Sequence, residues 1–366
     1  MRGPMATQRG AAIVSVLIVV SIATLLVASL FWQQHLATRS VQNRFASAQL
    51  RWIEAAVLDW AAVVLRADQN SSGQVDHLQE TWAVPVAETR LDETVTAGAR
   101  ISGSTRSALI AGQIFDAQSR FNLNNLVHDG KPAERQVIAF RRLLATLGLA
   151  PELEATLTRR LLESYPAPIV AGSAGGSSTA AASGSAANGG TSAAAAGATA
   201  TANGAAAGLS SNPAGAGRPI PALPPPLKLR DLLRVPGFDE RVVSTLAPFV
   251  TLLPKRIPGV EFANTTATRV NVNTAPAEVI AALIDDLPID SARSFVLARE
   301  RTVSSTLEQA GSRFGTPISL NAELFSVGSS FFLVSGMVRF ERVEASTEAL
   351  FFRGPARVEL LWRQQF

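Results

Sequence analysis

Hydrophobic residues follow three different patterns along this chain, and the first is a continuous apolar run. From Ala11 to Trp32 there are 22 residues without a charged side chain. A helix of that length spans about 33 Å, enough to cross a hydrocarbon core of roughly 30 Å. Secretory signal peptides carry a shorter run, about 7–15 residues, with the cleavage site after it. The run therefore predicts a membrane-spanning helix that is retained.

The second pattern is a helical one in residues 36–67. Apolar residues recur there at steps of three to five, while Arg39, Arg44, Arg51 and Asp59 lie mostly off the stripe. We expect this stripe to pack against a small sheet, and we expect the polar cluster 68–73 to form a turn that ends the helix. The stripe consists of Leu36, Val41, Phe45, Ala48, Trp52, Ala55 and Ala56.

The third pattern is alternation with a period of two in residues 330–364, which predicts half-buried antiparallel strands. Short β-favouring pieces also occur in residues 94–115. Helical patterns lie between them, at 133–165, 228–256 and 270–301. A sheet that begins before a helical block and finishes after it indicates an insertion. The predicted fold class is therefore α+β: a long N-terminal helix with a small antiparallel sheet, interrupted by an all-α domain of a SAM-like or helix-hairpin-helix-like kind.

Residues 171–217 have a different composition from the rest of the chain. They are almost entirely Ala, Gly, Ser, Thr and Asn, without a charged or aromatic residue. Such a segment cannot bury enough apolar surface to offset the entropy of ordering, so it is predicted to be a disordered linker. Its role is left open by the sequence.

The charge distribution and the motifs of the sequence argue against several classes of function. The net charge of +4 is spread evenly, without a run rich in Lys and Arg, which argues against electrostatic capture of nucleic acid. Hydrolase, nucleotide-binding and metalloprotease motifs are absent from the sequence, and His35, His77 and His128 are isolated. With no Cys, a zinc site is disfavoured. The sequence predicts that the protein is not an enzyme.

The residues around the apolar run predict its orientation and its processing. Arg2 and Arg9 precede the run, so the N-terminus is expected to stay cytoplasmic and the body to be exported. A short basic leader that ends in Gly10, followed by Ala11 and the apolar helix, resembles the type IV prepilin class. In that class a membrane peptidase cuts on the cytoplasmic side, after the Gly. The alternative is a plain signal-anchor helix.

Two stretches place Asn at alternate positions before a helix: Arg120-Phe-Asn-Leu-Asn-Asn-Leu126 and Val270-Asn-Val-Asn-Thr-Ala275. Asn and Thr side chains can accept hydrogen bonds from the free NH groups at a helix N-terminus, so capping is the expected role. The alternative is a polar binding surface.

These stretches, together with Leu229–Phe238 and Ser330–Ser335, resemble the K-type minor pseudopilins of type II secretion systems. Most pilins carry Glu at the fifth mature position, where this chain has Ser15, and its absence resembles the K type, which lies at the fibre tip. The resemblance implies a minor pseudopilin that takes part in protein export through fibre initiation. It implies cleavage between Gly10 and Ala11, methylation of Ala11, and a single inner-membrane span with the head in the periplasm.

The resemblance also implies partners and a division into segments. The partners would be minor pseudopilins of the I, J and H types, the major pseudopilin and the prepilin peptidase, with no nucleic acid. The segments are a leader 1–10, a transmembrane helix 11–35, the first part of the head 36–120, an inserted all-α domain 121–320 and the returning strands 321–366.

Two alternatives remain from the sequence. The first is a membrane-anchored helix-hairpin-helix protein of DNA uptake, but the expected hairpin, Asp285–Asp290, carries three carboxylates that would repel phosphate. Val235–Glu240 keeps one Gly and adds two acids. The second alternative is a generic anchored periplasmic adaptor.

A calcium site is a further possibility. Asp68, Asn70, Ser72 and Gly73 begin like a calcium-binding loop, but the twelfth position is Gln79 and Glu80 comes one residue late, so a polar turn is expected instead. The resemblance to the K type implies that Ca²⁺ is a possible cofactor. Its ligands stay unassigned, with Asp116 and the acids of residues 285–290 as candidates.

Overall fold

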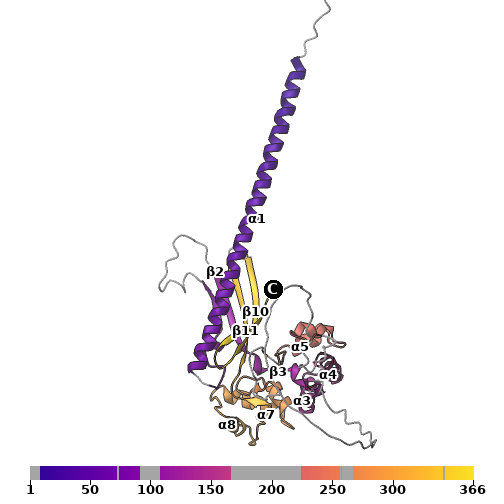
Figure 1. Ribbon diagram of the computed structural model, residues 1–366, viewed down its shortest axis with the longest axis vertical. Helices are drawn as coiled ribbons and strands as arrows, with labels where there is room; N and C mark the ends of the chain where they lie inside the picture. The colour runs from indigo at the N-terminus through magenta and orange to yellow at the C-terminus, as the bar shows by residue number, and fades with distance from the viewer. Residues whose placement is uncertain are drawn as a thin grey trace, which may run out of the picture.

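The structure is a computed structural model that describes residues 9–71, 74–90, 108–165, 224–255, 257, 267–340 and 343–366. Its dominant element is α1 (Arg9–Ser71), one helix of 63 residues. The first half of α1 projects alone from the molecule, and the second half lies along the head (Figure 1). The apolar run and the helical stripe of the sequence therefore form one continuous rod.

The head contains a five-stranded antiparallel sheet with the order β1-β2-β9-β10-β11. Ala108 of β2 pairs with Phe340 of β9, so the sheet joins segments more than 200 residues apart. The second half of α1 packs across this sheet, mainly on β9 and β10. The strands are β1 (Val86–Arg90), β2 (Ala108–Asp116), β9 (Phe331–Phe340), β10 (Val343–Arg353) and β11 (Val358–Gln365).

The chain between β2 and β9 forms a helical block with its own hydrophobic core. This block lies at the end of the sheet that is remote from the N-terminus of α1 (Figure 1). Its helices are α3 (Glu134–Thr146), α4 (Glu152–Ser164), α5 (Glu240–Leu246), α6 (Ala277–Leu283), α7 (Ile289–Arg299) and α8 (Leu307–Gly311).

Short 3₁₀ turns and strand pairs complete the head and the helical block. The turns are η1 (Thr81–Ala83), η2 (Ala117–Ser119), η3 (Leu123–Leu126) and η4 (Leu229–Arg234). The pairs are β3 (Phe121–Asn122) with β6 (Val250–Thr251), β4 (Val127–His128) with β5 (Lys131–Pro132), and β7 (Val270–Asn271) with β8 (Phe325–Ser326).

The predicted α+β class is confirmed, and several local predictions need correction. The helix ends within the polar cluster, but later than predicted, because residues 68–71 still belong to α1. The segment 228–256 is less helical than predicted, because its first part is the 3₁₀ turn η4 and its end is β6. The strand β1 and the helix α8 were not predicted. The expected strands at 94–107 and the linker 171–217 lie outside the described residues.

Candidate assembly surface

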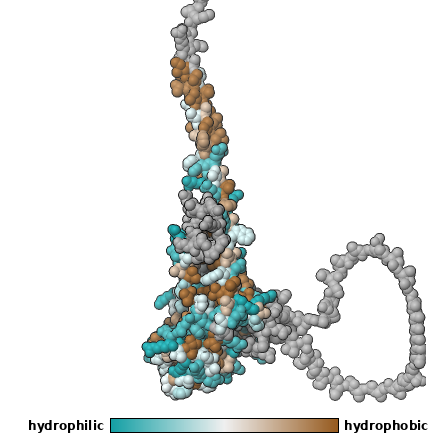
Figure 2. Space-filling view, turned by 90° about the vertical axis from the view of Figure 1, so that its left-hand side faces the viewer, coloured by the Kyte–Doolittle hydropathy of each residue, from teal (hydrophilic) through white to brown (hydrophobic). Residues whose placement is uncertain are grey.

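The first part of α1 presents hydrophobic side chains in all directions. From Ile13 to Trp32 the large apolar residues are exposed, and Figure 2 shows this hydrophobic surface on the projecting rod. Within the described residues one helix is long and apolar enough to cross a membrane, and it is this one. Gly10 and Ala11, the predicted cleavage pair, lie in its first turn. An apolar rod of this kind fits a membrane anchor.

The second part of α1 contacts the sheet with one face only. Buried apolar residues on that face pack against β9, β10 and neighbouring elements; they are Ala46, Leu50, Leu58, Ala61 and Leu65. The face also carries Glu54, whose Oε1 accepts a hydrogen bond of 2.9 Å from Thr347 Oγ1. We call it the sheet-facing side of α1.

The apolar stripe predicted from the sequence lies on the opposite side, which corrects the expectation that it packs on the sheet. Val41, Phe45 and Trp52 are exposed, and Trp52 as a whole residue is 79% accessible. Trp60 and Val63 extend the exposed stripe toward the end of the helix. A helix on the surface of a soluble domain normally turns a polar face to water, so this side is a candidate surface for assembly.

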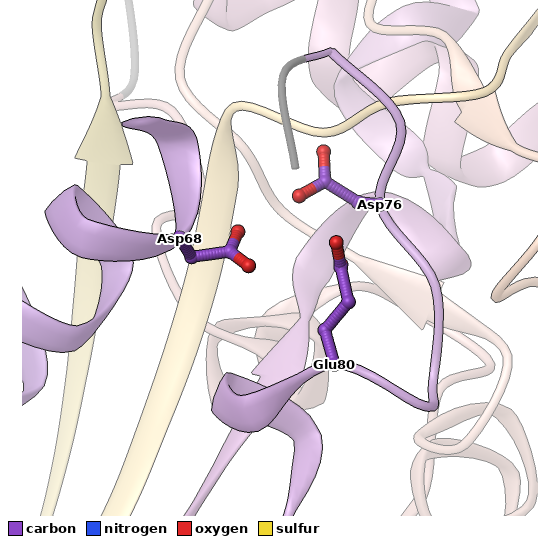
Figure 3. A group of neighbouring side chains, drawn as sticks. All are labelled: Asp68, Asp76 and Glu80. Carbon is purple, nitrogen blue, oxygen red and sulfur yellow. The ribbon is translucent and has the colours of Figure 1, made fainter. Parts of the chain in front are cut away.

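Four acids gather where α1 meets the helical block, and three of them are drawn in Figure 3. Asp68 from the last turn of α1, Asp76 from the following loop and Glu80 before η1 point toward one another, and ligand-type oxygens of all three lie within 4.8 Å. Arg353 at the end of β10 binds two of them, with its Nη1 2.7 Å from Asp68 Oδ2 and its Nη2 in contact with Asp76 Oδ1. The guanidinium thus supplies the positive charge inside this cluster.

The fourth acid, Asp116, is buried at the end of β2 and accepts several hydrogen bonds. Its Oδ2 accepts hydrogen bonds from Thr274 Oγ1 at 2.5 Å, Ser329 Oγ at 2.6 Å and Asn271 Nδ2 at 3.1 Å. Ser329 N in turn donates to Asp76 Oδ2 at 2.6 Å. The two acids therefore share Ser329, and the network joins the end of the sheet to the helical block.

Burial raises the pKa of both linked acids. For Asp76 the raised pKa is about 6, because desolvation outweighs the attraction of Arg353. For Asp116 desolvation also raises the pKa, against the hydrogen bonds from Ser329 and Thr274. A carboxyl with a raised pKa holds a proton in the folded chain at mildly acidic pH.

Asn122 caps η3 as predicted, whereas Asn271 closes a turn ahead of α6, whose N-cap is Pro276 without a side-chain cap, so the predicted capping is wrong for the second stretch. Both Asn residues also bridge distant segments. Asn122 Oδ1 accepts from Asn124 N at 3.1 Å and from Leu253 N at 3.0 Å. Asn271 Oδ1 accepts from Asn273 N at 2.9 Å, while its Nδ2 donates to Asp116. The local turn could be read from the spacing, but the second partner of each Asn could not.

The calcium-loop interpretation of residues 68–79 does not fit this arrangement. Asp68 and Asn70 are in the last turn of α1 rather than in a loop, and Arg353 already binds Asp68 and Asp76. The other candidate, Asp116, is held by protein donors. Asp285 pairs with Arg142, and Asp290 pairs with Arg293. Among the described residues, the predicted acids therefore do not come together as one cation site.

The three histidines lie apart from one another, and the acids of residues 285–290 are exposed. His35 lies on exposed α1, His77 Nε2 is 4.0 Å from Glu80 Oε1, and His128 Nε2 is 3.1 Å from Asp129 Oδ2. Asp285 and Asp286 lie in the link between α6 and α7, Asp290 lies in the first turn of α7, and all three are exposed. Their negative charge opposes the contact with phosphate that the DNA-uptake alternative needs.

Comparison with known protein families gives a consistent result. Residues 119–255 and 270–315 match two family models, both described as type II secretion system protein K. The chain belongs to the type II secretion system protein K family. The matched ranges cover the helical block, including both Asn-rich stretches that carried the resemblance in the sequence.

One curated relative and one solved structure extend this finding. The relative is the type II secretion system protein K of Pseudomonas aeruginosa, 37% identical over 161 residues. That alignment spans 43% of this chain and 44% of the relative, so less than half of each is compared. A chain in the crystal structure of the GspK–GspI–GspJ complex from enterotoxigenic Escherichia coli has a TM-score of 0.57 and 19% identity. The superposition covers 90% of this chain and 99% of that one, which shows the shared fold.

Proposed function

We propose that this chain is a minor pseudopilin at the tip of a type II secretion pseudopilus and that it takes part in protein export by initiating the fibre. The observation that carries the proposal is the combination of protein K family membership with α1, an apolar anchor continuous with the helix of the head. Its role is assembly rather than catalysis.

Processing at the start of α1 is the first step of this proposal. A cut between Gly10 and Ala11 removes the leader and leaves the whole apolar run as anchor and packing surface. Ala11 then becomes the N-terminal, methylated residue. The absence of Glu at Ser15 fits a subunit that needs no neighbour above it, because a carboxylate inside a membrane is costly without a partner.

The shape of the head supports a place at the tip. The helical block lies at the end of the head that is farthest from the anchor (Figure 1). In a fibre that grows from the membrane, such a block widens the leading end and leaves no site for a further subunit above. This subunit would therefore enter first.

The partners proposed are other minor pseudopilins of the I, J and H types, the major pseudopilin and the prepilin peptidase. The neighbouring structure is a complex of GspK with GspI and GspJ, and this supports the first group. The proposed location is the inner membrane, with the N-terminus cytoplasmic and the head in the periplasm, as Arg2 and Arg9 before the run favour.

The test is the intact mass of the full chain, extracted from membranes with and without a prepilin peptidase. We expect peptidase-dependent loss of residues 1–10, with Ala11 first, and no loss in a Gly10→Leu control. Deletion of the gene should stop secretion, and only the cleavable chain should restore it. An uncut chain, or one cut beyond residue 30, would contradict the proposal.

A further inference from the structure

Between the apolar run and the head, α1 has a stretch that is exposed throughout. Residues 33–45 are exposed at every position, and Ala46 is the first buried residue of the helix. This stretch connects the projecting apolar half of α1 to the half that lies along the head (Figure 1). We call residues 33–45 the neck of α1.

We infer that the neck binds anionic phospholipid headgroups on the head side of the membrane in which α1 is anchored. This inference rests on the proposed function for the placement of α1 in a membrane, and it adds a lipid partner that sets the depth of the anchor. Three features of the neck lead to it: its charge, its distance from the apolar run and the direction of its side chains.

The charge of the neck is positive and is not neutralised within the described part of the chain. Arg39 and Arg44 are its charged residues at neutral pH, and both are exposed. Neither forms an ion pair with an acid among the described residues. Residues 10–53 contain no Asp or Glu, and the first acid of α1, Glu54, is buried against the sheet. A neck of this charge attracts an anionic surface.

The position of the neck along α1 places it at the membrane surface. Trp32 closes the apolar run, and tryptophan is enriched at the boundary between hydrocarbon and headgroups. The headgroup layer adds about 5–8 Å on each side of a hydrocarbon core of roughly 30 Å. At about 1.5 Å per residue, Arg39 lies about 10 Å and Arg44 about 18 Å along the axis beyond Trp32. Arg39 is therefore next to the headgroup layer.

The direction of helical side chains brings both arginines closer to the lipid. Side chains on an α-helix lean toward its N-terminus, which in α1 is the membrane end. A long arginine side chain can therefore extend its guanidinium back toward the phosphates. Arg39 reaches them directly, and Arg44 lies within about one Debye length, roughly 8 Å, of the headgroups. Guanidinium groups bind phosphate oxygens through paired hydrogen bonds, so the lipid phosphate is the group recognised.

The lipid selectivity of the full chain in vesicles tests the inference. The uncleaved chain is reconstituted in phosphatidylcholine vesicles that contain spin-labelled phosphatidylglycerol or spin-labelled phosphatidylcholine. The fraction of each probe that is immobilised on the protein is then measured. We expect phosphatidylglycerol to be preferred, and we expect the preference to fall as the salt concentration rises. Arg2 and Arg9, at the other end of the apolar run, contribute equally to every variant of the neck.

Three double or single substitutions separate the neck from the overall charge of the chain. Arg39→Gln with Arg44→Gln should remove about half of the preference, because it leaves only Arg2 and Arg9 near a membrane surface. Arg39→Lys with Arg44→Lys keeps the charge and should keep most of the preference. Arg51→Gln is the matched control and should change nothing. It removes the same charge from the same helix, but about 28 Å beyond Trp32 and well over one Debye length from the headgroups.

The depth of the neck gives a second readout, which is possible because the chain contains no Cys. The variant Thr38→Cys is labelled on intact vesicles with an uncharged, water-soluble maleimide. Labelling should be slower in vesicles that contain phosphatidylglycerol than in pure phosphatidylcholine, and adding Arg39→Gln with Arg44→Gln should remove the difference. The control Ala48→Cys, about 24 Å beyond Trp32, should label at the same rate in both kinds of vesicle.

Three results would overturn the inference. The first is an unchanged preference in the variant Arg39→Gln with Arg44→Gln, and the second is an equal loss in Arg51→Gln. The third is loss of the preference when inorganic phosphate replaces chloride at the same ionic strength, because the neck would then bind free phosphate.

The vesicle experiments are independent of the test of the proposed function. If the lipid preference is absent but the chain is still cut after Gly10 and still required for secretion, the proposed function stands without the inference. If cutting and the requirement for secretion are both absent while the lipid preference holds, the proposed function fails and the lipid contact remains.

Discussion

The two sides of α1 differ in burial: one packs against the rest of the chain, and the other is exposed. The sheet-facing side is closed within the chain: Leu50, Leu58 and Leu65 are buried, and the acids on that side have partners on β10. The opposite side stays exposed although it is largely apolar, and we call it the distal face; it consists of Ala48, Trp52, Ala56, Trp60, Val63 and Ala67. One side of the helix therefore stabilises the fold, while the other is free to serve the proposed assembly, so mutations on the two sides should separate stability from binding. The predictions below test that separation, from the largest expected effect to the smallest.

Removing the cation of the buried acid cluster should have the largest effect. In Arg353→Met, Asp68 and Asp76 lose their cationic partner, and breaking a buried ion pair in this way costs about 3–5 kcal/mol. Urea unfolding of the full chain in detergent, followed by near-ultraviolet circular dichroism, measures the loss. The control Arg357→Met removes an exposed ion pair with Glu359 and should cost less than about 1 kcal/mol.

The second largest loss of stability is expected when a cavity is created on the sheet-facing side of α1. Leu65 is completely buried, so Leu65→Ala should reduce the free energy of unfolding by about 2–4 kcal/mol. Two residues away, the exposed Val63 offers a matched control, and Val63→Ala should change it by less than about 0.5 kcal/mol. Equal losses in the two variants would mean that the distal face is packed within the chain itself.

The raised pKa of Asp76 should make the free energy of unfolding depend on pH, and this effect should be of intermediate size. The folded chain keeps this proton up to a pH of about 6, whereas the unfolded chain loses it near 3.8, the ordinary pKa of an aspartate. The stability from Asp76 is therefore complete below about 3.8 and is lost as the pH rises through 6. Between pH 5 and pH 7 this group alone should remove about 1 kcal/mol.

The measurement compares urea unfolding at both pH values in the natural chain and in Asp76→Asn. The variant should lose less stability over this interval than the natural chain does. Asp285→Asn, a change at an exposed acid, should behave like the natural chain. A steeper pH dependence in Asp76→Asn would reverse the assigned sign.

The smallest effect on folding is expected at the distal face. Trp52→Ala should change the free energy of unfolding by less than about 0.5 kcal/mol, because its side chain is exposed. The same substitution at the buried Trp82 should cost about 3–5 kcal/mol. The contrast between Trp52 on α1 and Trp82 in η1, measured in one urea experiment, shows whether the exposed aromatic residue on α1 contributes to the stability of the fold.

Much of the fold followed from local patterns. The apolar run, the alternation in residues 330–364 and the helical periods at 133–165 are local signals, and the structure has α1, β9 to β11, α3 and α4 there. The Asn spacing predicted the cap at Asn122 for the same reason, but not the absence of a side-chain cap at α6. The end of α1 was misplaced because Asp68 looks like a turn residue, whereas in the fold Arg353 neutralises it and the helix continues.

The sequence by itself determined that α1 is a long helix with an apolar anchor, that strands return after a helical block, and that the chain resembles one family. Only the tertiary structure decided which side of α1 packs. The sheet-facing side contains Glu54 and Asp68, so by composition it is the less apolar one. Their charges are tolerated there because Thr347 and Arg353, nearly 300 residues away, supply the hydrogen bonds. These hydrogen bonds form only when β10 packs against α1. The periodicity of residues along α1 therefore does not predict them.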